Sequence, residues 1–324
     1  MSLIFTPTSR DALRKSTLAL SVALSLISAP LAHALTFNVT YDASVGSAPV
    51  GFTSAFGDAI GYFQSTFSNP VSINLNVGWG EVSGQPLGGA LGASSSYFVN
   101  YDYGTVRNAL LNVAAPGYLP VTDPTNGRLI DVNTANAKVL GLNTYSGPHS
   151  SDGAVGFDSA SQWTFDPNNR AVSGSYDFIG VAMHEISEVM GRSSSLVPTC
   201  TGSGCSESVQ DLFRYTAPGQ LDLTGTNAYL SINGGTSQVN AFNGDPTRGD
   251  LGDWNGNTPD AYNYAAATGQ LLPASAGDIT AMRALGYTLA TPVPVPDSAL
   301  LLLSGLALTV WLARRRKTQD LQPG

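Results

Sequence analysis

The sequence predicts an α+β fold for one central domain, residues 35–291, which lies between two terminal segments of different composition. Some short segments alternate apolar and polar residues as half-buried strands do, and other segments space apolar residues three and four positions apart as helices do. Gly, Pro, Asn and Ser are frequent between these segments, which is typical of a fold rich in turns. The domain is long enough, at about 260 residues, to bury one large core.

The predicted elements follow in order along the chain. Phe37–Tyr41 alternates like an opening strand, and Val71–Val77 alternates most clearly of all. Between them, Phe52–Phe67 has a wide apolar stripe at helical spacing, which ends before Pro70. Residues 114–169 carry so many turn-forming residues that no element is assigned there. Three further helices are predicted: Tyr103–Val113, Phe178–Met190 and Ser275–Leu285.

The N-terminal segment, residues 1–34, has the order of a secretion signal peptide. Basic residues at Arg10, Arg14 and Lys15 precede the apolar run Leu18–Ile27, and the small residues around Ala34 follow. The run is too short to span a bilayer comfortably, which disfavours a retained membrane helix. We therefore expect cleavage after Ala34 and export across the inner membrane.

The C-terminal segment, residues 292–324, joins a proline-rich linker to the apolar run Ala299–Ala313 and the basic cluster Arg314–Lys317. A basic cluster stays on the cytoplasmic side, so the run is predicted to be a transmembrane helix that anchors the chain transiently in the inner membrane. Val293–Lys317 resembles the PEP-CTERM sorting tail, with Pro-Val-Pro-Asp in place of Pro-Glu-Pro. The resemblance implies that the chain is an exosortase substrate, placed in the cell envelope or outside the cell after tail processing. An ordinary single-span anchor is the alternative.

Charge and cysteine content restrict the partners and the compartment. The formal net charge is −8, and the basic clusters lie at the two ends, so the domain between them is more acidic still. Such a surface argues against nucleic acid or anionic lipid as a partner. Cys200 and Cys205 are the only cysteines and flank a short Gly-containing turn, which predicts a local disulfide in an oxidising compartment. A two-cysteine metal site is the disfavoured alternative.

The segment Ser175–Ser194 contains the candidate metal ligands and the candidate general base. Ser175 is predicted to cap a helix that Gly191 ends. His184 and Glu188 are one turn apart on the same face, and both residue types are zinc ligands. Glu185 then stands where a general base could take a proton from the attacking water. The alternative is a polar helix face on which His184 and Glu188 form an ion pair.

The sequence HEISEVMGR resembles a group of metalloprotease-like proteins often found with PEP-CTERM tails, as do the segments Asp211–Tyr215 and Asp278–Tyr287. More distantly it resembles the metzincins, whose pattern is H-E-x-x-H-x-x-G-x-x-H. Glu188 replaces the second His of that pattern and Ser194 stands at the third ligand position. The resemblance implies a metzincin-like zincin domain with a long active-site helix, a zinc ion, and a peptide or protein substrate.

The ligand set of the predicted zinc site departs from the usual one in two ways. Replacing an imidazole by the carboxylate of Glu188 makes a zinc site more anionic, and a third protein ligand is still needed. Asp211 is the first candidate because it lies in the second matching motif, and a capping or turn aspartate is its alternative role. The other candidates for the third ligand are His149, Glu207 and Tyr215.

A calcium site is the second metal hypothesis. Asp253-Trp254-Asn255-Gly256-Asn257 begins like a calcium loop, but the glycine and the twelfth residue do not fit an EF-hand. A looser calcium site is conceivable because four aspartates lie in one stretch, although Asn/Gly turns explain the composition as well. These aspartates are Asp245, Asp250, Asp253 and Asp260.

Two functions are therefore carried forward. The first is an exported zinc metallopeptidase or related hydrolase that uses His184 and Glu188 as metal ligands and Glu185 as general base. The second is a non-catalytic cell-envelope or biofilm-matrix protein that retains a degenerate metalloprotease fold. The adjacency of Glu185 to His184 favours the hydrolase, since an ion pair alone gives no reason for a second glutamate there.

Overall fold

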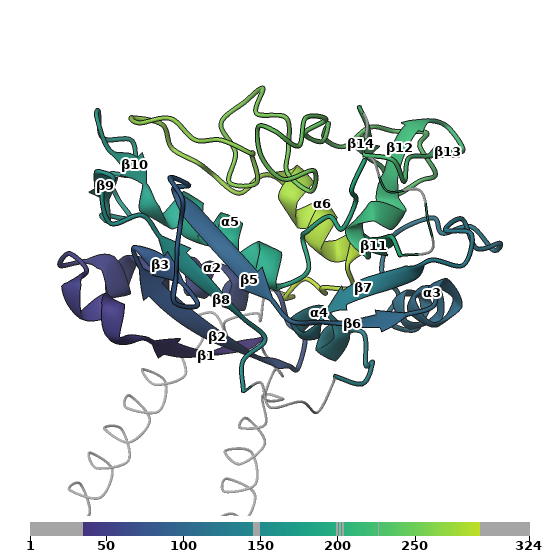
Figure 1. The fold of residues 1–324 in the computed structure, drawn as a ribbon, viewed down its shortest axis with the longest axis horizontal. Coiled ribbons are helices and arrows are strands. Elements are labelled where there is room, and N and C mark those ends of the chain that lie inside the picture. The colour runs from purple at the N-terminus through teal and green to yellow at the C-terminus, as the bar shows by residue number, and fades with distance from the viewer. Residues whose placement is uncertain are drawn as a thin grey trace, which may run out of the picture. The chain divides into compact units, whose positions relative to one another are not determined.

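A computed structural model describes residues 35–144, 150–198, 200, 202, 204–225 and 227–291 (Figure 1). The predicted signal peptide, the predicted sorting tail and His149 lie outside the described residues. The chain divides into two units after Leu289, and the features below belong to the first. Helices and strands are mixed throughout this unit, which agrees with the predicted α+β class. None of the helices in the described part has the length and apolar character that a membrane span requires.

A four-stranded sheet forms the base of the site. Its order is β1 (Thr36–Tyr41), β2 (Ser72–Trp79), β8 (Gly153–Phe157) and β5 (Gly92–Ser96). The first three strands are parallel, whereas β5 runs antiparallel to β8 and forms one edge. The alternation predicted for β1 and β2 is confirmed. β8 was missed because all five of its residues are buried, so it shows no alternation between faces.

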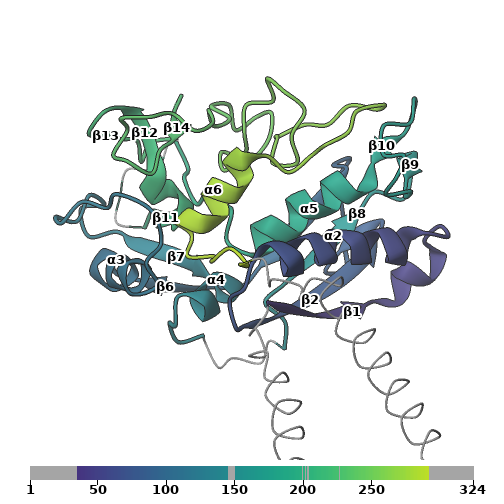
Figure 2. The same cartoon turned by 180° about the vertical axis from the view of Figure 1, so that it is seen from behind.

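Two helices, α2 (Phe52–Thr66) and α5 (Phe178–Val189), lie side by side against this sheet (Figure 2). Their apolar faces meet in an aromatic cluster, in which the ring of Phe52 lies 5.0 Å from Trp79 and 5.1 Å from Phe178 between centroids. Phe157 of β8 lies 4.8 Å from Phe178. Buried aromatic rings contribute strongly to packing, so this cluster helps to fix α5 over the sheet.

A second group of elements flanks the first. Strands β11 (Ser206–Ser208), β7 (Leu129–Asn133) and β6 (Phe98–Tyr101) form a smaller sheet. The remaining helices and short strands are α3 (Tyr103–Asn112), α4 (Thr134–Val139), α6 (Ala276–Ala284), η1 (Ala43–Ser47), η2 (Gln210–Phe213), β3 (Glu81–Val82), β4 (Gln85–Pro86), β9 (Trp163–Thr164), β10 (Tyr176–Asp177), β12 (Arg214–Ala217), β13 (Gln220–Leu221) and β14 (Tyr229–Leu230).

One segment, residues 231–275, is here called the long loop. All its residues are described, yet it contains no helix or strand, only isolated bridges. Asn243 holds one turn of it by donating from its side-chain amide to the carbonyl oxygens of Asp245 and Gly249. Trp254 is 1% exposed and anchors the middle of the loop. Structureless loops of this length are uncommon inside compact domains and are usually functional.

Candidate metal centre

Helix α5 is fixed at both ends by residues close to the site. Asp177, not Ser175 as predicted, is the N-cap: its carboxylate accepts a hydrogen bond from the Gly180 amide at 3.3 Å. Asp177 has this role because Arg170 holds both its oxygens at 2.8 Å. At the other end Gly191 has φ 111°, a left-handed conformation that favours glycine, and so the predicted end of the helix is confirmed.

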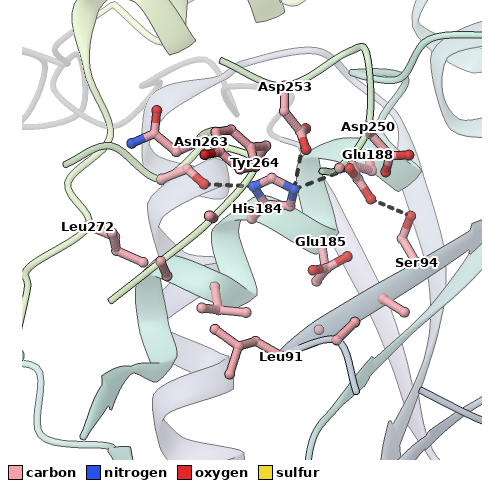
Figure 3. A pocket seen from close by; sticks show the side chains of 18 of the residues that line it. Leu91, Ser94, His184, Glu185, Glu188, Asp250, Asp253, Asn263, Tyr264 and Leu272 are labelled. Carbon is pink, nitrogen blue, oxygen red and sulfur yellow. Dashed lines mark hydrogen bonds and ion pairs between the residues drawn. The ribbon is translucent and has the colours of Figure 1, made fainter. Parts of the chain in front are cut away.

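His184 is positioned by the long loop. Its Nδ1 lies 2.8 Å from the carbonyl oxygen of Ala261 (Figure 3). A proton on Nδ1 would satisfy that carbonyl and leave the lone pair of Nε2 free, as in histidine ligands of metals. The Nε2 atom lies 3.2 Å from Oε1 of Glu188 and 3.4 Å from Oδ1 of Asp253. Three potential ligand atoms, two from α5 and one from the long loop, therefore face one point.

The structure brings Asp253, rather than the expected Asp211, beside His184 and Glu188. Among the described residues, His184, Glu188 and Asp253 form the one group of three potential ligands whose donor atoms lie within 4.8 Å of one another. Asp211 is buried elsewhere, because its carboxylate accepts hydrogen bonds from Ser194 Oγ, the Ser195 amide and the Ser208 amide at 2.7, 3.0 and 2.8 Å. It ties the segment after α5 to β11, which is the turn role considered as its alternative.

The other ligand candidates also lie away from this point. Glu207 forms a buried ion pair with Arg128. Tyr215 is buried, and its hydroxyl lies 3.5 Å from the carbonyl oxygen of Tyr118. Neither lines the cleft described below.

Among the described residues, no three of the four aspartates of the calcium hypothesis bring carboxylate oxygens within 4.8 Å of one another, although Asp250, Asp253 and Asp260 line one cleft. Asp245 accepts from the amide and hydroxyl of Thr247, and Asp260 accepts from the Tyr262 amide. Asp253 belongs to the group around His184, and Asp250 faces the same cleft. The stretch that was weighed for calcium thus supplies the third potential zinc ligand.

Charge is balanced inside this group by Arg192, which sequence analysis did not single out. Its guanidinium donates to Asp253 Oδ1 at 2.6 Å and lies 3.3 Å from Glu188 Oε1. Burial alone would raise the pKa of Glu188, but His184 and Arg192 outweigh it and lower the pKa to about 2. Burial alone would lower the pKa of His184, but Asp253 and Glu188 raise it to about 10. The i, i+4 spacing of Glu188 and Arg192 was the available signal for this contact.

Glu185 lies next to His184 on the side of the edge strand β5 (Figure 3). A Cβ atom at Gly92 would lie 2.4 Å from Oε1 of Glu185, so only glycine leaves room for this carboxylate beside the strand. Burial raises the pKa of Glu185 well above its usual range, and the charge of Glu188 adds to the effect. A raised pKa suits a group that must accept and return a proton near neutral pH.

These residues line a cleft of about 590 Å³. One wall is the chain at Leu91–Ser94, the floor is α5, and the opposite wall is part of the long loop. Part of the lining is apolar and consists of Leu91, Val181 and Leu272. Asp250 belongs to the polar part of the lining. The negative charge of Glu188, with burial, raises the pKa of Asp250 to about 6. Such a cleft, with converging polar groups in an otherwise apolar lining, has the character of a ligand site.

Comparisons of the chain with protein-family models, curated proteins and solved structures give no match. The function is therefore argued from the geometry of the site.

Proposed function

We propose that the protein is an exported zinc-dependent peptidase of metzincin-like fold, with His184, Glu188 and Asp253 as zinc ligands and Glu185 as general base. The observation that carries the proposal is the convergence of one imidazole nitrogen and two carboxylate oxygens within 4.8 Å, in a cleft that also contains Glu185. Three protein ligands with an open fourth position are usual for catalytic zinc.

The donor set fits zinc on chemical grounds. Zinc accepts imidazole nitrogen and carboxylate oxygen at nearly equal distances, and the contact of His184 Nδ1 with the Ala261 carbonyl leaves Nε2 as the donor. Two of the three groups are almost completely buried, which distinguishes them from ordinary surface acids. A bound zinc ion would polarise the carbonyl group of the substrate.

The protein's own residues would do the remaining work. Glu185 would take a proton from the attacking water and return it to the leaving amine, which is the role of a general base and acid. Strand β5 pairs with β8 on one side only, and the chain from Leu91 to Ser94 faces the cleft. An extended peptide could therefore pair with this edge and present a carbonyl group to the site.

The test uses the purified full-length chain, with zinc content and peptide hydrolysis measured side by side. His184→Ala should lose both. Glu185→Gln should keep zinc and lose turnover by about 100-fold or more, the usual size of a general-base contribution. Glu81→Gln makes the same chemical change outside the cleft and should change neither. Less than about one equivalent of zinc in the unmodified chain, after incubation with zinc, would contradict the proposal.

The ion pairs of Arg192 with Glu188 and Asp253 support a second function, that of a non-catalytic envelope protein. Because Arg192 and His184 already lie against both carboxylates, the group is charge-balanced as an internal ion-pair network. Absence of zinc binding together with a strong loss of stability in Glu188→Gln would favour this function over the peptidase.

Export and sorting are proposed on the two terminal segments alone. We expect the mature chain to begin at Leu35 and its tail to be processed near Pro296 by an exosortase-type enzyme. Mass spectrometry of the protein from its native envelope checks both ends. Released protein that still carries Arg314–Lys317 would contradict the processing of the tail.

A further inference from the structure

Arg192 uses almost every donor of its guanidinium at the proposed zinc site. Its Nε donates to Ser187 Oγ at 2.7 Å, one terminal nitrogen donates to Asp253 at 2.6 Å, and the other lies 3.3 Å from Glu188. The Cζ atom of Arg192 lies 4.4 Å from the centre of the Tyr262 ring. With a side chain that is 0% exposed, Arg192 is fixed in position and cannot swing to the surface.

The two carboxylates that Arg192 touches come from different parts of the chain. Glu188 lies on α5, and Asp253 lies on the long loop, which has no helix or strand of its own. Two buried carboxylates repel each other unless a cation lies between or beside them. The donors of a guanidinium form a rigid planar fork that can hold both at a fixed separation, whereas an ammonium on its flexible stem fixes their separation less firmly.

The net charge of the proposed site, with Arg192 included, equals that of a zinc site made of two histidines and one carboxylate. Two neutral histidines, one carboxylate and Zn²⁺ give a net charge of about +1. One neutral histidine, two carboxylates and Zn²⁺ give about zero, and the guanidinium of Arg192 restores +1. The positive charge of Arg192, three residues beyond the end of α5, thereby compensates for the carboxylate that Glu188 places where a histidine would stand.

Ser94 controls the second oxygen of Glu188. Its hydroxyl, on strand β5, donates to Glu188 Oε2 at 2.7 Å (Figure 3). With Oε2 held by the strand, Oε1 is the oxygen that faces His184 Nε2 at 3.2 Å. Glu188 therefore has a partner on its outer oxygen, whereas Arg192 contacts Oδ1 of Asp253, the same oxygen that faces His184.

We propose that Arg192 and Ser94 are positioning residues for zinc, which hold the carboxylates of Glu188 and Asp253 in the geometry of a binding site. This inference rests on the proposed function. Outer partners of metal ligands reduce metal affinity by about 10- to 100-fold when they are removed. The readout is the zinc dissociation constant, measured by chelator competition, together with the visible spectrum of the cobalt-substituted protein, which reports coordination geometry.

Arg192→Met should weaken zinc binding by about 100-fold, and Arg192→Lys should weaken it by about 10-fold, since it keeps the charge but loses the double contact. Ser94→Ala should weaken it by about 10-fold and alter the cobalt spectrum, whereas Ser94→Thr keeps the hydroxyl and should restore both. Ser95→Ala, the next residue on the same strand, should leave the zinc constant unchanged.

Several outcomes would overturn the inference. If Arg192 acted only as a competing cation, its removal would tighten zinc binding. Unchanged zinc constants in folded Arg192→Met and Ser94→Ala would show that neither residue positions a ligand. If Arg192→Met fails to fold, Arg192→Lys and the Ser94 pair still decide the question. Failure of the unmodified chain to bind zinc would instead contradict the proposed function, so the two failures are distinguishable.

Discussion

Helix α5 and the long loop meet at the same point, but they are held in place by different means. The helix is buried on nearly all sides and packs through aromatic rings against α2 and the sheet. The loop has no regular backbone pairing and is held by single buried side chains, among them Asn243 and Trp254. The helix side therefore depends on apolar packing of a regular element, whereas the loop side depends on scattered backbone hydrogen bonds and a few buried side chains. Substitutions on the two sides should fail in different ways.

The largest expected effect separates the two aspartates. Asp253→Ala removes the loop's only proposed ligand and should weaken zinc binding by on the order of 1000-fold or more, with the helix still folded. Asp211→Ala should leave zinc binding unchanged but lower the free energy of unfolding by roughly 3 kcal/mol, because buried amides lose their acceptor. Chelator competition and denaturant unfolding measure the two quantities. Weaker zinc binding in Asp211→Ala would reopen the earlier assignment.

That contrast explains what sequence could and could not provide. His184, Glu185 and Glu188 were found because a helix places residues one turn apart at known positions. Asp253 was noticed, but as part of a calcium loop, because no local pattern states that a residue 65 positions beyond Glu188 returns to the helix. Asp211 was preferred on motif resemblance, which carries no distance. Prediction of the fold was likewise limited to local patterns. The sequence predicted segments that alternate between apolar and polar residues, such as β2, but not the fully buried strand β8.

The next effect concerns the anchor of the long loop. Asp278 on α6 accepts a hydrogen bond from Trp254 Nε1 at 2.7 Å. Burial, together with the charge of Asp260, raises the pKa of Asp278 to about 7. The folded state then keeps a proton that the unfolded chain releases near pH 4, so stability should fall as the pH rises from about 4 to about 7 and level off above. The total loss is roughly 4 kcal/mol.

Unfolding free energies across this pH range, measured with a chelator present, check the prediction. Asp278→Asn should reduce the slope, and Asp245→Asn, an exposed change in the long loop, should not. Part of the slope should persist in Asp278→Asn because burial also raises the pKa of Glu207 to about 7. An unchanged slope in Asp278→Asn would show that Asp278 is ionised in the folded state.

A smaller effect is expected from the disulfide, which the structure forms between Cys200 and Cys205 as predicted. The bond closes a very short loop in the connection from α5 to β11. Replacing both cysteines by serine should lower the unfolding free energy by at most about 2 kcal/mol and leave zinc binding unchanged. Denaturant unfolding of the variant beside the unmodified chain measures this loss. A greater loss, or weaker zinc binding, would mean that this connection also positions the site.

The smallest effect is expected from strand β5, on one side of the cleft. At Gly92 this strand supplies no proposed zinc ligand and affects the site only by steric contact with Glu185. Gly92→Ala places a Cβ where Oε1 and Cγ of Glu185 lie at 2.4 and 2.8 Å, so the glutamate must move. A displacement of this kind should lower kcat by about 10-fold while zinc binding stays unchanged, since the ligands are not touched. Gly57→Ala, which adds a Cβ with no atom nearby, is the matched control.

A double-mutant cycle shows whether the effect of Gly92→Ala passes through Glu185. If it does, adding Gly92→Ala to Glu185→Gln should cause little further loss of turnover, because the displaced group has already lost its function. Full additivity of the two losses would indicate instead that the new methyl group obstructs the substrate along β5. In that case the edge strand would limit peptide binding directly, and KM rather than kcat would change in the single variant.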